Sequence, residues 1–225
     1  MQTFFSYQPN TDVIYSDLGF LLLGWAIEKM SALPLDQAVQ KTVLAPLGLE
    51  HSWFRPLDEN FNPLLPLPEA GAAPTGICRW RQRRLIGEVD DENSAFLKGV
   101  CGHAGMFGTA EDLSAFGSAF LAGDSFLPAA VIHEMTRSQS VSKDGLMNRG
   151  IGFQLWSPDP AVSYAPLSRQ TFGHTGFTGT VLWIDPQQEL IIALLTNEVY
   201  NGRFNRKIGP FRLEVIKTIL EETEK

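Results

Sequence analysis

The sequence has few cysteines, few charged side chains and no long hydrophobic run. Only 2 of its 225 residues are cysteine, and charged residues make up 19% of the chain against 44% for hydrophobic residues. This composition is that of an ordinary globular protein and excludes a disordered or fibrous chain. The longest apolar run extends only over residues 18–27 and is interrupted by glycine. A membrane-spanning helix needs about 20 apolar residues, so we expect a buried helix there and no membrane span.

Basic side chains are in the minority, with 18 Lys and Arg against 25 Asp and Glu and a net charge of -7. A nucleic-acid-binding protein needs a basic surface, so no nucleic-acid partner is expected. The arginines around Trp80 predict an exposed turn; they are Arg79, Arg81, Arg83 and Arg84.

The N-terminal region has no basic segment leading into an apolar one, so we expect no signal peptide and a soluble chain. The compartment stays open.

The two cysteines do not form a recognisable metal or redox pattern. Cys78 and Cys101 are far apart in the sequence, without a CxxC motif and without a histidine at ligand spacing. We expect both to be buried free thiols, and a disulfide between them is the alternative.

Helical patterns come first along the chain and strand patterns follow. Residues 1–148 predict mainly helices and loops, and residues 149–225 predict antiparallel strands with a C-terminal helix, which indicates a single α+β domain. A helix expected at Tyr15–Ser31, capped by Ser16 or Asp17, is apolar on nearly all sides and should lie inside the protein. Two further helices are expected to begin near Asp36 and after Thr109, and two more to cover residues 128–136 and 210–222. Strands are expected at residues 149–156, 172–176, 179–185 and 189–197. Residues 55–102 are expected to be irregular.

Two short motifs carry side chains suited to proton transfer. Tyr15 and Asp17 flank the start of the first expected helix, where the positive partial charge of the helix N-terminus favours a phenolate. The segment 173–179 (GHTGFTG) enters a strand and offers an imidazole and a hydroxyl. Its glycines let a ligand approach the backbone closely. Taken singly, a packing tyrosine and an ordinary hairpin are the alternative interpretations.

In their order along the chain, these motifs resemble those of the serine β-lactamase-like hydrolases, which include class C β-lactamases, DD-peptidases and related esterases. The matching stretches are YSDLGFLLLG (15–24), LAPLGL (44–49), GHAGMFGTAEDL (102–113), GHTGFTGT (173–180) and WIDP (183–186), and GEVDDEN (87–93) resembles the DD-peptidase-like branch. The resemblance extends over nearly the whole chain. It implies a β-lactamase/transpeptidase-like fold that is incomplete at the N-terminus.

This family works by acyl transfer, in which a serine attacks a carbonyl carbon and a lysine one helical turn later helps to remove its proton. The resemblance makes Tyr15 the proton-relay residue, Asp17 the counterpart of an asparagine in the family motif, and His174 the residue in the Lys or His position. The substrate-binding residues that it implies are Thr175, Gly176 and Phe177, the last through a backbone N–H that forms one half of the oxyanion hole.

The sequence departs from the family pattern at both motifs. Asp17 brings a negative charge that asparagine lacks, and His174 removes a fixed cation that would bind a substrate carboxylate. Both departures favour an esterase or a DD-peptidase-like hydrolase over a true β-lactamase.

The Ser-x-x-Lys motif that should precede Tyr15 is missing. The serine in that region, Ser6, has Pro9 three positions later, and the only Ser-x-x-Lys of the sequence lies at Ser140–Lys143, after the tyrosine motif and in a polar stretch without helical periodicity. We therefore expect that the chain is inactive alone, and whether it is an enzyme stays open.

No cofactor and no metal site are expected. The acidic segment 88–92 predicts a solvated loop, with a cation site as the alternative. His103 lies between two glycines and, by the resemblance, should be near the chemistry without taking part in it.

Two functions remain open. The first is a serine hydrolase acting on a small-molecule or peptidoglycan-like acyl substrate, and the second is a non-catalytic remnant or interaction module of the same fold. In either case the family resemblance implies an unpaired strand edge and an uncovered helix surface. We therefore expect a homo-oligomer or a complementary N-terminal polypeptide as partner. Family members are often exported or periplasmic.

Overall fold

The largest element of the fold is a six-stranded antiparallel sheet. The computed structural model describes residues 7–223 apart from 9, 70, 124–125, 160–165 and 205, so Ser6 and Pro9 lie outside the described residues. The strands of the sheet follow the order β10-β9-β8-β7-β6-β5. They are β5 (Ser140–Val141), β6 (Asn148–Arg149), β7 (Gln154–Leu155), β8 (Phe172–Thr175), β9 (Val181–Asp185) and β10 (Leu190–Leu194). Two small sheets pair β1 (Trp53–Phe54) with β4 (Met106–Phe107) and β2 (Pro74–Cys78) with β3 (Arg83–Ile86).

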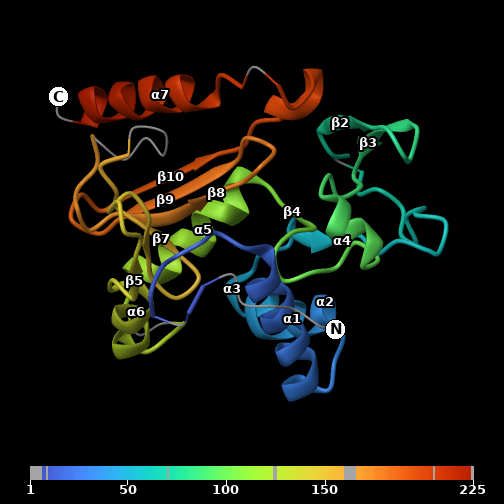
Figure 1. The fold of residues 1–225 in the computed structure, drawn as a ribbon, viewed down its shortest axis with the longest axis horizontal. Coiled ribbons are helices and arrows are strands. Elements are labelled where there is room, and N and C mark those ends of the chain that lie inside the picture. Colours follow the sequence, from blue (N-terminus) through green and yellow to red (C-terminus); the bar gives the residue numbers. More distant parts are fainter. Residues whose placement is uncertain are drawn as a thin grey trace.

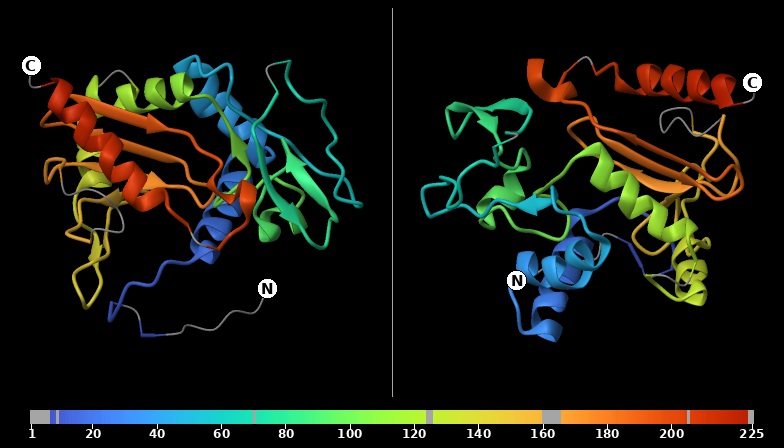
Figure 2. Two further views of the ribbon diagram at one scale, coloured as in Figure 1. Left: turned by 90° about the horizontal axis from the view of Figure 1, so that it is seen from above. Right: turned by 180° about the vertical axis from the view of Figure 1, so that it is seen from behind.

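Helices cover both faces of the large sheet, with α5 (Ala110–Leu121) on one face and α7 (Ile208–Thr223) on the other (Figure 1). On the side of the molecule opposite to α7, α1 (Asp17–Ser31) packs with α2 (Leu35–Val39), as Figure 2 shows from behind. The remaining helical segments are the π-helical turn η1 (Gln40–Leu44), α3 (Ala45–Leu47), α4 (Glu92–Phe96), α6 (Ala129–Thr136) and the 3-10 turn η3 (Glu198–Asn201). The expected α+β architecture is confirmed.

The core lies on the two faces of β9, because successive side chains of a strand point to opposite faces. Leu182 and Ile184 pack with Phe120 of α5, whereas Val181 and Trp183 pack with Ile216 of α7. Every residue of β9 is buried, and its first four residues are apolar, as expected for a strand covered on both faces.

The strand predicted at residues 149–156 is wrong as a single element. It folds back on itself as β6 and β7, with Arg149 paired to Gln154. Gly152, which lies in the turn, has a φ of 78°, a conformation that glycine adopts without steric cost. The turn places Arg149 on β6, which is separated by β7 from β8, the strand that carries His174.

The irregular segment predicted at residues 55–102 is also wrong in part, because it contains the β2–β3 hairpin and α4. Arg81 in the hairpin turn is buried rather than exposed, and its guanidinium donates a hydrogen bond to the Val89 carbonyl at 2.9 Å. Glu88 and Asp90 are buried as well and pair with Arg83 and Arg203 at 2.9 and 3.0 Å. Both buried carboxylates are thus paired with an arginine, and the expectation of a solvated acidic loop is wrong at Glu88 and Asp90.

The prediction that the first helix lies inside the protein is wrong for this chain. Helix α1 has the predicted extent and its N-cap is Ser16, but Gly24 is its only buried residue. Cys78 and Cys101 are buried free thiols, as expected.

Candidate active site

The start of α1 positions Tyr15 and Asp17. Ser16 has an extended backbone and accepts a hydrogen bond from the Leu18 N–H at 3.3 Å, which fixes the first turn of the helix. Further along, a Cβ on Gly24 would lie 3.1 Å from the Gly102 nitrogen, and one on Gly102 would lie 2.2 Å from the Phe20 carbonyl oxygen. Only glycine lets α1 approach the loop at residue 102 this closely, and this contact holds the end of the helix that bears Tyr15.

Strand β8 brings His174 to Tyr15. His174 pairs with Leu182 across the sheet, and its ring centroid lies 6.1 Å from that of Tyr15. Thr175 follows at the end of the strand, where its carbonyl oxygen hydrogen-bonds His174 Nδ1 at 2.7 Å. A carbonyl can only accept, so Nδ1 carries the proton and Nε2 presents a lone pair.

Arg149, which no sequence motif indicated, completes this arrangement. A guanidinium nitrogen of Arg149 donates to His174 Nε2 at 3.1 Å, and the guanidinium lies 5.3 Å from the centre of the Tyr15 ring. The fixed cation whose loss we inferred from His174 is therefore present, but it comes from β6. The sequence places Arg149 in no recognisable motif, and only the sheet register reveals its position.

His174 is a neutral imidazole at neutral pH. Burial lowers its pKa below the ordinary value, the Thr175 carbonyl opposes this, and the nearby Arg149 lowers the pKa further. A neutral ring is also what the hydrogen bond from Arg149 to Nε2 requires.

A pH dependence of stability follows from the lowered pKa. Between the folded and unfolded pKa values the unfolded chain binds more protons, so the contribution of His174 to the free energy of unfolding is complete above about pH 6.5. It is lost as the pH falls through the folded-state pKa. We expect that His174→Gln loses less stability than the wild type between about pH 7.5 and pH 5, measured by urea unfolding. The exposed His133→Gln should follow the wild type, and parallel losses in all three proteins would contradict the assignment.

The phenolate expected at Tyr15 is not favoured. Partial burial raises the pKa of Tyr15, the negative charge of Asp17 raises it further, Arg149 lowers it, and Asp91 again raises it. Tyr15 therefore carries its proton at neutral pH, because partial burial and the nearby carboxylates raise its pKa and oppose a phenolate at the helix N-terminus.

Asp17 lies close to Asp91 and His103. One ligand atom of each lies within 4.8 Å of the others. Asp91 Oδ1 is 2.9 Å from His103 Nε2 and also accepts from the Ser94 N–H at 2.7 Å, which caps α4. His103 was expected near the site, and Asp91 belongs to the acidic segment for which a cation site was the alternative interpretation. Two carboxylates and an imidazole are suitable ligands for a divalent cation, although the mutual hydrogen bond and the cap already occupy Asp91.

The loop after β8 presents the Phe177 N–H. The Gly176 N–H donates to the Thr180 carbonyl at 2.8 Å and the Gly179 N–H to the Gly176 carbonyl at 3.1 Å, which closes a tight turn. Within the described part of the chain, no group accepts a hydrogen bond from the Phe177 N–H. Arg206 donates to the Phe177 carbonyl, and the ring lies 5.1 Å from Arg203 and 4.8 Å from Arg206. The donor that the family resemblance places in the oxyanion hole is thus held in a rigid turn.

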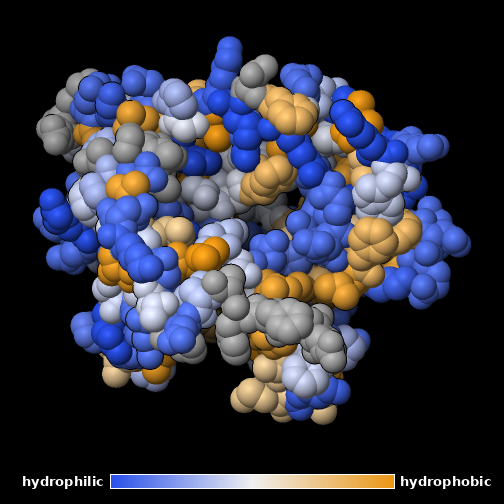
Figure 3. Space-filling model, in the orientation of Figure 1, coloured by the Kyte–Doolittle hydropathy of each residue, from blue (hydrophilic) through white to orange (hydrophobic). Residues whose placement is uncertain are grey.

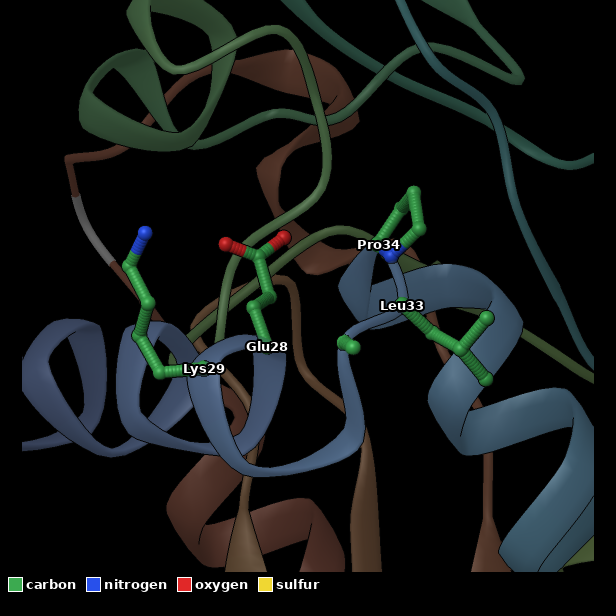
Figure 4. Close-up of a pocket in the computed structure, with 5 residues that line it drawn as sticks. Glu28, Lys29, Leu33 and Pro34 are labelled. Atoms are coloured by element: carbon green, nitrogen blue, oxygen red, sulfur yellow. The ribbon is translucent and has the colours of Figure 1, made fainter.

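A shallow pocket at the other end of α1 does not belong to this site. Its lining includes Glu28, Lys29, Leu33 and Pro34, at the turn between α1 and α2 (Figure 4). Glu28 accepts a hydrogen bond from the Leu35 N–H at 3.0 Å, so its carboxylate has a structural role in the start of α2.

Comparison with known proteins identifies the family of this chain. A model of the β-lactamase family matches residues 2–217. The chain is 33% identical to a putative D-alanyl-D-alanine carboxypeptidase of Salmonella paratyphi B, with 91% of this chain and 49% of that protein covered. The chain therefore spans about half the length of this curated relative.

Two solved structures share the fold at low sequence identity. The octameric penicillin-binding protein homologue of Pyrococcus abyssi superposes with a TM-score of 0.65 at 20% identity, over 94% of this chain and 44% of its own. A β-lactamase of Mycobacterium bovis superposes with a TM-score of 0.61 at 20% identity, over 93% and 65%. The order of the motifs, the fold and the family match agree, and the chain belongs to the serine β-lactamase-like hydrolase family.

Proposed function

We propose that this chain supplies the proton-transfer and oxyanion side of a serine acyl-transfer site that cleaves an amide or ester next to a free carboxylate. Arg149 is the observation that carries the proposal, because its guanidinium contacts both Tyr15 and His174. A guanidinium binds a carboxylate with two parallel hydrogen bonds. This favours the DD-peptidase-like branch over an esterase, in line with the name of the Salmonella relative.

The other residues have separate tasks in the proposed reaction. Tyr15 is protonated at neutral pH, so its hydroxyl can donate a proton to the leaving group and recover one from the attacking serine. The Phe177 N–H stabilises the negative oxygen that forms on the substrate carbonyl. His174 stays neutral and orients Arg149, and Thr175 lies beside it for contact with the substrate carboxylate.

The Ser-x-x-Lys at residues 140–143 does not have the helical geometry of the family motif. Ser140 lies in strand β5, so Lys143 is not one helical turn away, and the Lys143 ammonium pairs with Asp12 at 3.5 Å. We therefore propose that the chain alone binds carboxylate-bearing acyl compounds without turning them over. Incubation with a fluorescent penicillin and with a p-nitrophenyl ester tests this, and covalent labelling of any serine of this chain would contradict it.

The carboxylate preference can be measured without turnover. We expect an N-acyl-D-alanyl-D-alanine dipeptide to bind better than its C-terminal amide, and Arg149→Gln to weaken binding of the acid at least about tenfold, the scale of a charge-assisted hydrogen bond. Calorimetry or NMR titration gives both affinities. The exposed Arg137→Gln, whose side chain pairs with Glu134, is the matched control. Equal binding of acid and amide would exclude the role of Arg149.

A further inference from the structure

Helix α1 exposes an unusual amount of apolar surface. Seven large apolar side chains of this helix are exposed: Leu18, Phe20, Leu22, Leu23, Trp25, Ile27 and Met30, with Trp25 58% and Met30 87% exposed. Gly24 is buried, the residues at positions 17, 21, 26 and 28 are partly buried, and the other residues of the helix are exposed. Apolar side chains gather over the lower part of the molecule in Figure 3, where α1 lies in Figure 1. A helix that is hydrophobic on all sides belongs in an interior, and a contiguous exposed apolar patch marks an interaction surface.

The geometry favours a protein over a membrane as the cover of this face. No single helix among the described residues is long and apolar enough to span a bilayer, and the pair formed by α1 and the segment Leu35–Leu47, which passes by length and composition, is bent by 74°. A polar residue near each end of α1 also contacts other parts of the protein. Asp17 lies with Asp91 and His103 at one end, and Glu28 binds the start of α2 at the other.

We propose that the exposed face of α1 docks a complementary polypeptide that carries the nucleophile, equivalent to the part of the Salmonella carboxypeptidase that this chain does not match. The proposal rests on the proposed function. The chain covers 49% of that relative, so a segment of similar size is available as the occupant. Tyr15 stands at the N-terminal end of α1 and is 58% exposed. A polypeptide that covers α1 therefore also lies next to Tyr15, so its docking would at the same time complete the active site.

The outer edge of β10 offers the same partner a second contact. β10 is the terminal strand of the large sheet, and among the described residues no strand pairs with its outer side. The strand is Leu-Ile-Ile-Ala-Leu and holds no charge, proline or bulge that would discourage pairing. An extended segment can add to such an edge through main-chain hydrogen bonds.

Coexpression tests the docking surface. The full chain is expressed together with a tagged version of the unmatched part of the Salmonella protein, so that the two can fold on each other. We expect light scattering to show a 1:1 complex. We also expect the chain alone to bind a hydrophobic dye and the complex not to bind it. The double variant Leu22→Glu, Trp25→Glu should reduce the recovered complex at least about tenfold, as for two central interface residues. Phe204→Glu, which alters an 85% exposed side chain outside α1, should leave the recovery unchanged.

Four outcomes would overturn the proposed docking surface. The absence of a complex does so directly, as does a complex that the double variant leaves intact. If the chain forms a homodimer, and only the double variant dissociates it, the exposed face of α1 binds a second copy of the chain. If the chain floats with phosphatidylglycerol vesicles, and only the double variant abolishes flotation, the face binds a membrane. Circular dichroism confirms that the exposed substitutions leave the fold unchanged. A complex that forms but is not labelled by the fluorescent penicillin would contradict the proposed function and leave the docking surface standing.

Discussion

Replacing Gly173 by alanine is expected to lower the free energy of unfolding by more than about 4 kcal/mol, a loss seen only when a core cannot absorb a change. A Cβ at this position would lie 1.9 Å from the Leu182 carbonyl oxygen and 2.6 Å from the Trp183 ring. Both belong to β9, which is buried throughout. This steric clash can be relieved only by separating β8 from β9, and the separation breaks the hydrogen bonds between the two strands that hold His174 in place.

Urea unfolding followed by tryptophan fluorescence measures this effect. Gly19→Ala is the matched control, because Gly19 lies in α1 and a Cβ there would meet nothing within 4 Å. In a helix interior, alanine is favoured over glycine by about 1 kcal/mol, so the control should be slightly more stable than the wild type. Stability of Gly173→Ala within 1 kcal/mol of the wild type would show that the two strands are not packed as described.

Replacing Tyr15 by phenylalanine is expected to reduce acylation at least about a hundredfold in the completed site, the scale of a positioned general acid or base. The substitution removes only the hydroxyl. The ring stays beside Arg149 and His174, where no core contact is lost because the side chain is largely exposed. The effect should therefore fall on the rate of acylation, and binding of the dipeptide should stay the same.

The rate of labelling by a fluorescent penicillin, measured on the coexpressed complex, checks this expectation. Tyr200→Phe serves as the control, since Tyr200 contacts Arg84 on the far hairpin and lies outside the proposed machinery. An unchanged rate in Tyr15→Phe would remove Tyr15 from the proton path. A rate lowered only through weaker dipeptide binding would make it a substrate contact instead.

The parts of the site that are local in sequence could be predicted, and those that depend on long-range packing could not. The helix start at Tyr15 and the strand at His174 each rest on a few neighbouring residues, so pattern and resemblance were enough. Arg149 reaches His174 through two pairings, of Arg149 with Gln154 and of Gln154 with Gly173. The first pairing needs a turn that the sequence analysis read as a continuous strand.

Two further differences have the same kind of cause. The charges of Glu88 and Asp90 indicated a solvated loop, but the arginines that neutralise them are remote in sequence or lie on the hairpin that was not predicted. The apolar pattern of α1 predicted an interior helix, but most of the helix is exposed in this chain. Its exposure reflects what surrounds the helix, a property that the sequence of the helix does not contain.

The seam between Gly24 and Gly102 also has a consequence for biosynthesis. Helix α1 leaves the ribosome early, whereas the residues that it meets, at position 102 and at His174, are translated much later. At 5–20 residues per second, roughly 10–30 s separate the synthesis of Tyr15 from that of His174. During this interval the apolar helix has no partner from the rest of the described sheet. We therefore expect chaperones that hold exposed hydrophobic segments to bind the nascent chain, and the yield of folded protein in the cell to depend on them.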